Sequence, residues 1–154
     1  MERPLSVEDV IMWLEGLSKG TICQEVETVS MEGLQVVLAQ KGFLRCNFLV
    51  PDRLSDRDGN WYVGAMATLM DNLGAAVICS SVSHVKSTVE LSISYYSTAK
   101  IQEEVEIEAK VVGEKEKATA AVVEIRRRSN GELIASGRQW MATGSNNRRE
   151  LSKL

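Results

Sequence analysis

The sequence predicts an α+β fold in which one antiparallel β-sheet wraps around a long central helix. Three observations support this prediction. The stretch 61–80 is rich in Ala, Leu and Met and is too long for a strand, which predicts a helix. Apolar and polar residues alternate in several later segments, as they do in half-buried strands. A chain of 154 residues, 44% of them apolar, can bury one sizeable core, so we expect a single domain over 1–145.

The first predicted element is a short amphipathic helix over 6–19. Ser6 opens a capping pattern that Asp9 completes three residues later. An apolar stripe then continues until Gly20, where we expect the helix to end.

A hairpin and a loop are predicted next. Two apolar runs of β-type composition, 34–39 and 43–50, are separated by Lys41 and Gly42, which predicts two paired strands. The segment 51–59 is polar and has no apolar period, so we expect a loop there.

The helix predicted over 61–80 is apolar nearly all round, so it must be buried in the core or against a second subunit. It is also long enough to cross a membrane, which takes roughly 20 residues. Asp71 lies at its middle, however, and an aspartate at the centre of a bilayer costs about 2.5 to 3.5 kcal/mol. We therefore expect no membrane span.

Four strands are predicted after the helix. Asn130 and Gly131 separate the last two and tolerate the positive φ of a tight hairpin turn. A long antiparallel sheet has exposed edges, which proteins often cover by pairing them across a two-fold axis, so we expect at least a homodimer. The predicted strands cover 88–95, 105–111, 121–125 and 133–141.

Composition excludes several classes of partner. A net charge of -3 and an aromatic content of 5% do not suit nucleic-acid binding. The three cysteines are widely spaced in apolar stretches, which predicts buried free thiols in a reducing compartment. His84 is the single histidine, and we expect no metal site. The cysteines are Cys23, Cys46 and Cys79.

The two ends of the chain bear on its location. Residues 1–20 have no uninterrupted apolar region, so no secretory signal peptide is predicted. The last three residues, Ser152, Lys153 and Leu154, form a tripeptide that the peroxisomal import receptor reads. We expect a peroxisomal protein, with 146–154 as a flexible tail that presents this signal.

Asp71 is the strongest candidate for chemistry, because burial of an ionised carboxylate costs several kcal/mol unless it is paired or hydrogen-bonded. The alternative is that an arginine or a backbone donor from elsewhere meets it, or that it lies at an exposed edge. As a functional group it can act as general base or nucleophile. Gly64 lies two turns earlier, roughly 10 Å away, at a helix N-terminus whose N–H groups can hold an oxyanion. Both can act on one carbonyl only if the helix N-terminus belongs to a partner subunit.

Three segments carry a resemblance to a known family. They are 56–72 (DRDGNWYVGAMATLMDN), 87–100 (STVELSISYYSTAK) and 131–138 (GELIASGR). In sequence and spacing they resemble the hotdog-fold acyl-CoA thioesterases of the PaaI-like, thioesterase superfamily member 2 type, over about 34–143. The resemblance implies a hotdog fold and hydrolysis of a fatty acyl-CoA without metal or cofactor. It also implies a homodimer or a dimer of dimers, and we expect a plant peroxisomal member.

The resemblance assigns roles to five positions. Asp71 is the base or nucleophile, and the backbone N–H groups of Val63 and Gly64 form the oxyanion hole. A loop Asn that polarises the carbonyl falls on Asp56, and a strand Ser that orients water falls on Thr88. Thr88 keeps the hydroxyl, whereas an ionised Asp56 cannot donate a hydrogen bond. Either Asp56 is protonated in a dry site or another residue, Asn60, supplies the amide.

The same resemblance places coenzyme A along 95–100 and 113–118. The substrate-binding candidates are Asn60, Tyr95, Ser97, Lys100, Lys115 and Lys117. Arg126–Arg128 form a further basic run, and each of these basic side chains can equally be a solvated surface group. Two other functions stay open: a thioesterase for an aromatic, dihydroxynaphthoyl-type acyl-CoA, and an acyl-CoA-binding protein without catalytic activity.

Overall fold

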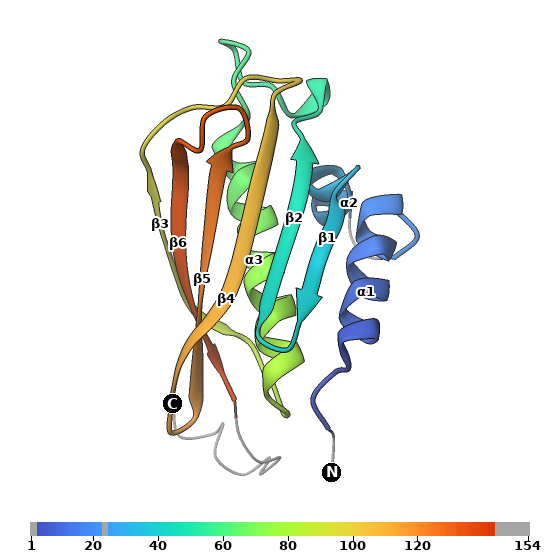
Figure 1. Cartoon of the computed structure of the whole chain (residues 1–154), viewed down its shortest axis with the longest axis vertical. Helices are drawn as coiled ribbons and strands as arrows, with labels where there is room; N and C mark the ends of the chain where they lie inside the picture. The colour runs from blue at the N-terminus through green and yellow to red at the C-terminus, as the bar shows by residue number, and fades with distance from the viewer. Residues whose placement is uncertain (1–2, 23–24, 144–154) are drawn as a thin grey trace.

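The computed structural model describes residues 3–22 and 25–143, and its main feature is a single antiparallel sheet (Figure 1). The strand order is β1-β2-β4-β5-β6-β3, and the long helix α3 packs against one face of the sheet. The helices are α1 (Val7–Lys19), α2 (Glu25–Met31) and α3 (Val63–Ser81), with a 3-10 turn at Asp52–Leu54. The strands are β1 (Gln35–Gln40), β2 (Phe43–Leu49), β3 (Thr88–Tyr95), β4 (Glu104–Lys115), β5 (Ala118–Arg127) and β6 (Leu133–Ala142).

Helix α1 forms as its capping pattern predicts. The N–H of Asp9 donates to the Ser6 hydroxyl, and the Asp9 carboxylate accepts from the N–H of Ser6, both at 3.0 Å. Gly20 ends the helix with a φ of 68°, a left-handed conformation that glycine adopts without strain. The apolar stripe of Val10, Leu14 and Leu17 is buried, which fixes α1 to the domain.

Helix α2 is absent from the predicted elements. Its seven residues bury only Ser30 and Met31, so no apolar period of useful length appears in the sequence. It packs against α1 and α3, and Met31 is fully buried. Tertiary packing therefore stabilises this helix where local pattern does not.

Helix α3 confirms the predicted buried helix but begins two residues later than expected. Trp61 and Tyr62 remain extended because their N–H groups donate to the carbonyls of Ala99 and Leu54, each at 2.7 Å. By length and composition α3 passes as a candidate membrane span, yet 61% of its apolar window is buried inside the structure. It is therefore best explained as the core helix that the sheet surrounds.

The strands follow the predicted alternation, and the predicted hairpins form. Gly42 and Gly131 have φ values of 76° and 74° in the β1–β2 and β5–β6 turns. Strand β4 is longer than predicted, because its pairing with β5 continues to Lys115. β1 and β3 are the two edges of the sheet, and most of β3 is exposed.

The prediction of free thiols is confirmed for the two cysteines that the structure describes. Cys46 and Cys79 are free; Cys46 is buried and Cys79 is half-buried. Burial raises the pKa of the Cys46 thiol to about 12 and also raises that of Cys79. Cys23, the tail 146–154 and the terminal tripeptide lie outside the described residues.

Candidate active site

Asp71 lies near the middle of α3, half-buried where the helix faces β3 and β6. Its Oδ1 accepts hydrogen bonds from the Nε2 of Gln139 at 2.6 Å and from the Thr88 hydroxyl at 3.1 Å. Both donors are neutral, and among the described residues no ion pair of Asp71 accompanies these hydrogen bonds. The structure therefore brings Thr88 and Asp71 together; the role of Thr88 in orienting water stays a prediction.

Gln139 completes this group and is a residue that the sequence-based candidates omit. Its side chain is fully buried, and Nε2 also lies 2.9 Å from the Thr88 hydroxyl oxygen. The Thr88 oxygen therefore accepts from Gln139, and its hydrogen is directed to Asp71. An available signal was the polar Gln139 at an inward position of β6, in phase with the buried Ala135, Gly137 and Met141.

Gly74 makes room for this arrangement on α3. A Cβ at this position would lie 1.9 Å from the Oε1 of Gln139, so any side chain here would displace the glutamine. Within the described part of the chain, that Oε1 is buried and has no hydrogen-bond partner. The Gln139 amide is thus held by its donor side alone, toward Asp71 and Thr88.

The N-terminus of α3 is the predicted place of the oxyanion donors. Tyr62 is the N-cap residue and provides no side-chain hydrogen bond, and Val63 is 51% exposed. The first N–H groups of a helix have no partner within it, so Val63 and Gly64 can donate to an anion. The Tyr62 ring approaches Gly64 closely, since a Cβ there would lie 2.6 Å from it. The Tyr95 hydroxyl donates to the Val63 carbonyl at 3.3 Å.

Asp56 has a structural role in the loop that precedes α3. Its Oδ1 accepts from the N–H groups of Asp58 at 2.8 Å and Asn60 at 2.9 Å, which closes the loop before α3. The hydrogen bond from the Asn60 backbone, chiefly, lowers the pKa of Asp56, and the side chain is exposed. Within one chain, these observations do not support a protonated Asp56 in a dry site. The Asn60 side chain stays the candidate amide; its Oδ1 is buried without a partner among the described residues.

The expected coenzyme A residues separate into two groups. Tyr95, Ser97 and Lys100 lie at or after the end of β3, whereas Lys115 and Lys117 lie at the β4–β5 turn. These sites are at opposite ends of β4 (Figure 1), whose 12 residues span roughly 40 Å. Lys115 and Lys117 line an open groove of about 590 Å³ there. One chain alone cannot bring both groups to the same phosphate.

Arg126–Arg128 and His84 are not among the described residues that contact Asp71. Arg126 pairs with Glu124 at 3.0 Å and Arg128 with Glu104 at 3.5 Å, while Arg127 is bound on several sides. His84 follows α3 and lines a pocket of about 540 Å³, whose lining does not include Asp71, Thr88 or Gln139. In residues 3–22 and 25–143, no group of three or more His, Cys, Asp or Glu side chains is placed to hold a metal ion.

Comparison with known proteins gives a consistent result. A model of the Thioesterase superfamily matches residues 58–134, a range that includes Asp71 and Thr88 but not Asp56 or Gln139. Acyl-coenzyme A thioesterase 13 of Mus musculus is 29% identical over 116 residues, which cover 75% of this chain and 83% of that protein.

Solved structures agree with this match. The crystal structure of zebra fish thioesterase superfamily member 2 has a TM-score of 0.78 and 26% identity, covering 91% of this chain and 99% of that one. A hypothetical thioesterase protein with coenzyme A from Streptococcus pneumoniae has a TM-score of 0.67 at 18% identity, covering 73% and 87%, and supports the fold alone. The predicted hotdog fold is confirmed.

Proposed function

The chain belongs to the thioesterase superfamily and is a thioester hydrolase, and from that premise we propose that it hydrolyses an acyl-CoA to the free acid and coenzyme A. The observation that carries the proposal is the half-buried Asp71 carboxylate, held at one oxygen by Gln139 and Thr88. The similarity to acyl-coenzyme A thioesterase 13 supports the class of substrate. Water is the second substrate, and the proposed reaction uses no cofactor.

Asp71 is proposed to act through its second oxygen. Both hydrogen bonds found among the described residues reach Oδ1, so Oδ2 is available to accept a proton from water. The water oxygen then attacks the thioester carbonyl carbon. When the tetrahedral intermediate collapses, the C–S bond breaks and the thiolate of coenzyme A takes up the proton that Asp71 accepted from water. In the alternative role, Oδ2 itself attacks the carbonyl carbon, the C–S bond breaks and coenzyme A leaves as the thiolate, and water then hydrolyses the resulting anhydride.

The oxyanion is proposed to bind at the N-terminus of α3 in a partner subunit. Within one helix, Val63 and Gly64 are about 10 Å or more from Asp71, too far to act on the same carbonyl. The exposed edge strand β3, which carries Thr88, lies beside this site and is open for pairing with a second copy. We therefore propose a homo-oligomer whose sites form between subunits.

Coenzyme A is proposed to contact the segment after β3. Lys100 is exposed there, and its ammonium group lies 3.3 Å from the Asp58 carbonyl, at the loop that precedes α3. The S. pneumoniae relative of the same fold was crystallised with coenzyme A, which supports this class of ligand. Lys115 and Lys117 can contribute to the same ligand only from another subunit.

A second candidate function is acyl-CoA binding without catalysis. It is favoured by Asp56, because its carboxylate is committed to the loop and cannot donate a hydrogen bond to the substrate carbonyl. The covering of Gly64 by the Tyr62 ring also narrows access to the α3 N-terminus.

One assay distinguishes these functions. The purified protein is offered aliphatic acyl-CoAs of increasing length and an aromatic, dihydroxynaphthoyl-type acyl-CoA, and release of free thiol is followed. We expect turnover, with a loss on the order of 10²-fold or more in Asp71→Asn, which keeps the shape but not the basicity. Saturable binding of coenzyme A without turnover across the panel would favour the binding protein. Full activity of Asp71→Asn would remove Asp71 from the mechanism.

The location is proposed from the terminal tripeptide. A fluorescent protein fused in front of the chain is expected in peroxisomes, and deletion of Ser152, Lys153 and Leu154 should leave it in the cytosol. Unchanged peroxisomal fluorescence after deletion would contradict this assignment.

A further inference from the structure

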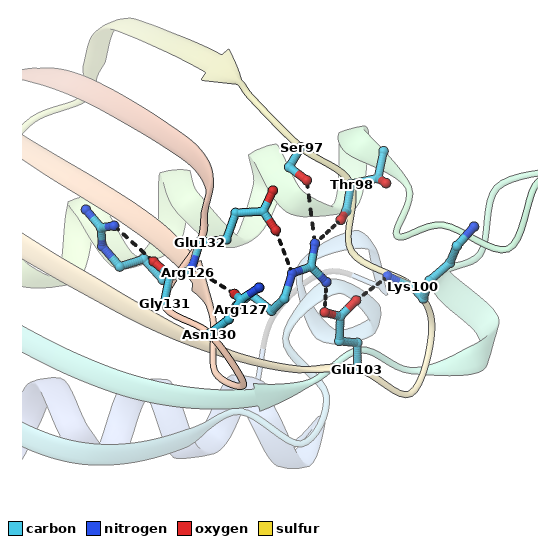
Figure 2. Close-up of polar contacts among 9 residues, drawn as sticks. All are labelled: Ser97, Thr98, Lys100, Glu103, Arg126, Arg127, Asn130, Gly131 and Glu132. Atoms are coloured by element: carbon cyan, nitrogen blue, oxygen red, sulfur yellow. Dashed lines mark hydrogen bonds and ion pairs between the residues drawn. The ribbon is translucent and has the colours of Figure 1, made fainter.

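Arg127, at the end of β5, is the member of the basic run that faces inward. Its side chain is 17% exposed, against 44% for Arg126 and 51% for Arg128. Figure 2 shows its guanidinium group between the β5–β6 turn and the segment that joins β3 to β4, called here the 96–103 loop. The position of Arg127 therefore differs from that of a solvated surface cation.

The guanidinium group contacts both sides of this gap. On the turn side, Nε pairs with the Glu132 carboxylate at 2.9 Å. On the loop side, Nη1 forms an ion pair with Glu103, and Nη2 donates to the Thr98 carbonyl at 2.8 Å. Nη2 also lies 3.5 Å from the Ser97 hydroxyl. A planar fork of donors suits such a multiple contact better than the single ammonium group of a lysine.

Glu103 contacts both Arg127 and the backbone of Lys100. One carboxylate oxygen of Glu103 meets Arg127, and the other accepts from the backbone N–H of Lys100 at 2.8 Å (Figure 2). Glu103 is only 20% exposed, so loss of Arg127 would leave a shielded negative charge beside Lys100. The Arg127–Glu103 ion pair and the Glu103–Lys100 hydrogen bond therefore connect the end of β5 to the exposed Lys100.

Arg127 adds side-chain contacts to a loop that backbone hydrogen bonds hold at several points. The N–H of Ser97 donates to the carbonyl of Ile134 at 3.2 Å, and the carbonyl of Ala99 accepts from Trp61 at 2.7 Å. The carbonyl of Thr98, which lies between these two positions, accepts from Arg127. Arg127 therefore joins the middle of the loop, and Glu103 at its end, to β5.

We propose that Arg127 is a positioning residue that holds the 96–103 loop in the shape with which Ser97 and Lys100 meet the coenzyme A portion of the substrate. This inference rests on the proposed function. The single positive charge of Arg127 is already paired with the carboxylates of Glu103 and Glu132, so we assign it no phosphate contact, and it acts through the loop. The hydrogen bond from Arg127 is the main cause of the lowered pKa of Glu132.

The first test compares two thioesters of the same acid, one of coenzyme A and one of N-acetylcysteamine, which lacks the nucleotide and phosphates. For Arg127→Met we expect KM for the acyl-CoA to rise on the order of 10-fold, with kcat within about twofold of the unaltered protein. KM for the N-acetylcysteamine thioester should not change. Arg127→Lys, which keeps the charge without the fork, should give an intermediate KM.

Matched variants control for folding and for charge. Arg128→Met removes a neighbouring arginine whose ion pair with Glu104 lies outside the loop, and should leave both KM values unchanged. If Arg127→Met does not fold, Arg127→Met combined with Glu103→Gln removes both members of the ion pair and should show the same rise in KM. Amide hydrogen exchange of 96–103 should be faster in either Arg127 variant than in Arg128→Met.

The possible outcomes separate the two proposals. Equal KM values and equal exchange of the loop in Arg127→Met and Arg128→Met would overturn the role of Arg127 alone. A similar rise in KM for both thioesters would also overturn it, because the effect would not depend on the coenzyme A portion. Absence of turnover and of coenzyme A binding in the unaltered protein would overturn the proposed function, and the positioning role with it.

Discussion

Gln139 shows how a single buried amide can set the direction of a hydrogen-bond network. Its Nε2 donates to both Asp71 and Thr88, so the Thr88 hydroxyl has one remaining direction for its own hydrogen, toward Asp71. Two donors on Oδ1 hold the carboxylate in one orientation. Gln139 is therefore a positioning residue for the proposed base.

Replacement of Gln139 by leucine tests this role. Leu has a similar volume, and the change removes an Oε1 that has no partner among the described residues, so we expect the melting temperature to change by no more than about 4 °C. We expect kcat to fall on the order of 10-fold, because Asp71 loses its shortest hydrogen bond. Thermal melting and steady-state kinetics give the two readings. A folded Gln139→Leu with normal kcat would show that Asp71 needs no such support.

A substitution at Asp56 is expected to raise kcat rather than lower it. Asn keeps the oxygen that accepts from the backbone of Asp58 and Asn60, so Asp56→Asn should retain the loop. It also adds an amide donor where the carboxylate has none, so we expect kcat to rise several-fold. Asp58→Asn, which leaves the Asp56 oxygen in place, serves as the control. An unchanged or lower kcat in a folded Asp56→Asn would exclude position 56 from contact with the carbonyl.

At the scale of elements, the helices differ in how far local sequence specifies them. α1 has its cap, its apolar stripe and its terminal glycine in sequence, and its predicted bounds agree closely with the observed Val7–Lys19. α2 has none of these signals and depends on contacts with α1 and α3. The start of α3 was also missed by two residues, because distant carbonyls of Leu54 and Ala99 hold the preceding residues extended.

The cap of α1 gives a prediction for stability. Ser6→Ala removes the acceptor of the Asp9 N–H and should cost about 1 kcal/mol, or about 2 to 4 °C in melting temperature for a domain of this size. Ser6→Thr keeps the hydroxyl and should be nearly neutral. The melts are compared at one protein concentration, since assembly also affects the transition. Equal melting temperatures for all three proteins would mean that α1 frays without loss to the domain.

At the scale of the whole molecule, the sequence predicted the strands of the sheet but not the contacts that depend on strand register and strand length. Alternation predicted the strands, and the quoted motifs predicted Asp71 and Thr88 as partners in one site. Gln139 was missed because its approach to Asp71 depends on the register of β6 against β3 and on the space left at Gly74. The separation of Lys100 from Lys115 and Lys117 follows from the length of β4. The alternation of apolar and polar residues predicted a strand over 105–111, whereas β4 covers Glu104–Lys115.

The same geometry makes the proposed site incomplete within one chain, since Asp71 and the N–H of Val63 are about 10 Å or more apart along α3. Val63→Pro removes that N–H while the helix is retained: proline is tolerated in the first helical turn, and Tyr62 before it is already extended. Alone, Val63→Pro and Asp71→Ala should each lose on the order of 10²-fold in kcat.

Mixed assemblies of these two variants decide whether the site lies between subunits. If they are unfolded together and refolded at equal amounts, half of the dimers pair one chain of each kind. Each mixed dimer contains one site with both an intact Asp71 and an intact helix N-terminus, so activity should return to about one quarter of that of the unaltered protein. The separately refolded variants, mixed afterwards, are the control and should stay inactive. If co-refolded protein forms dimers but stays as inactive as its parents, Asp71 and the oxyanion donors must act within one chain.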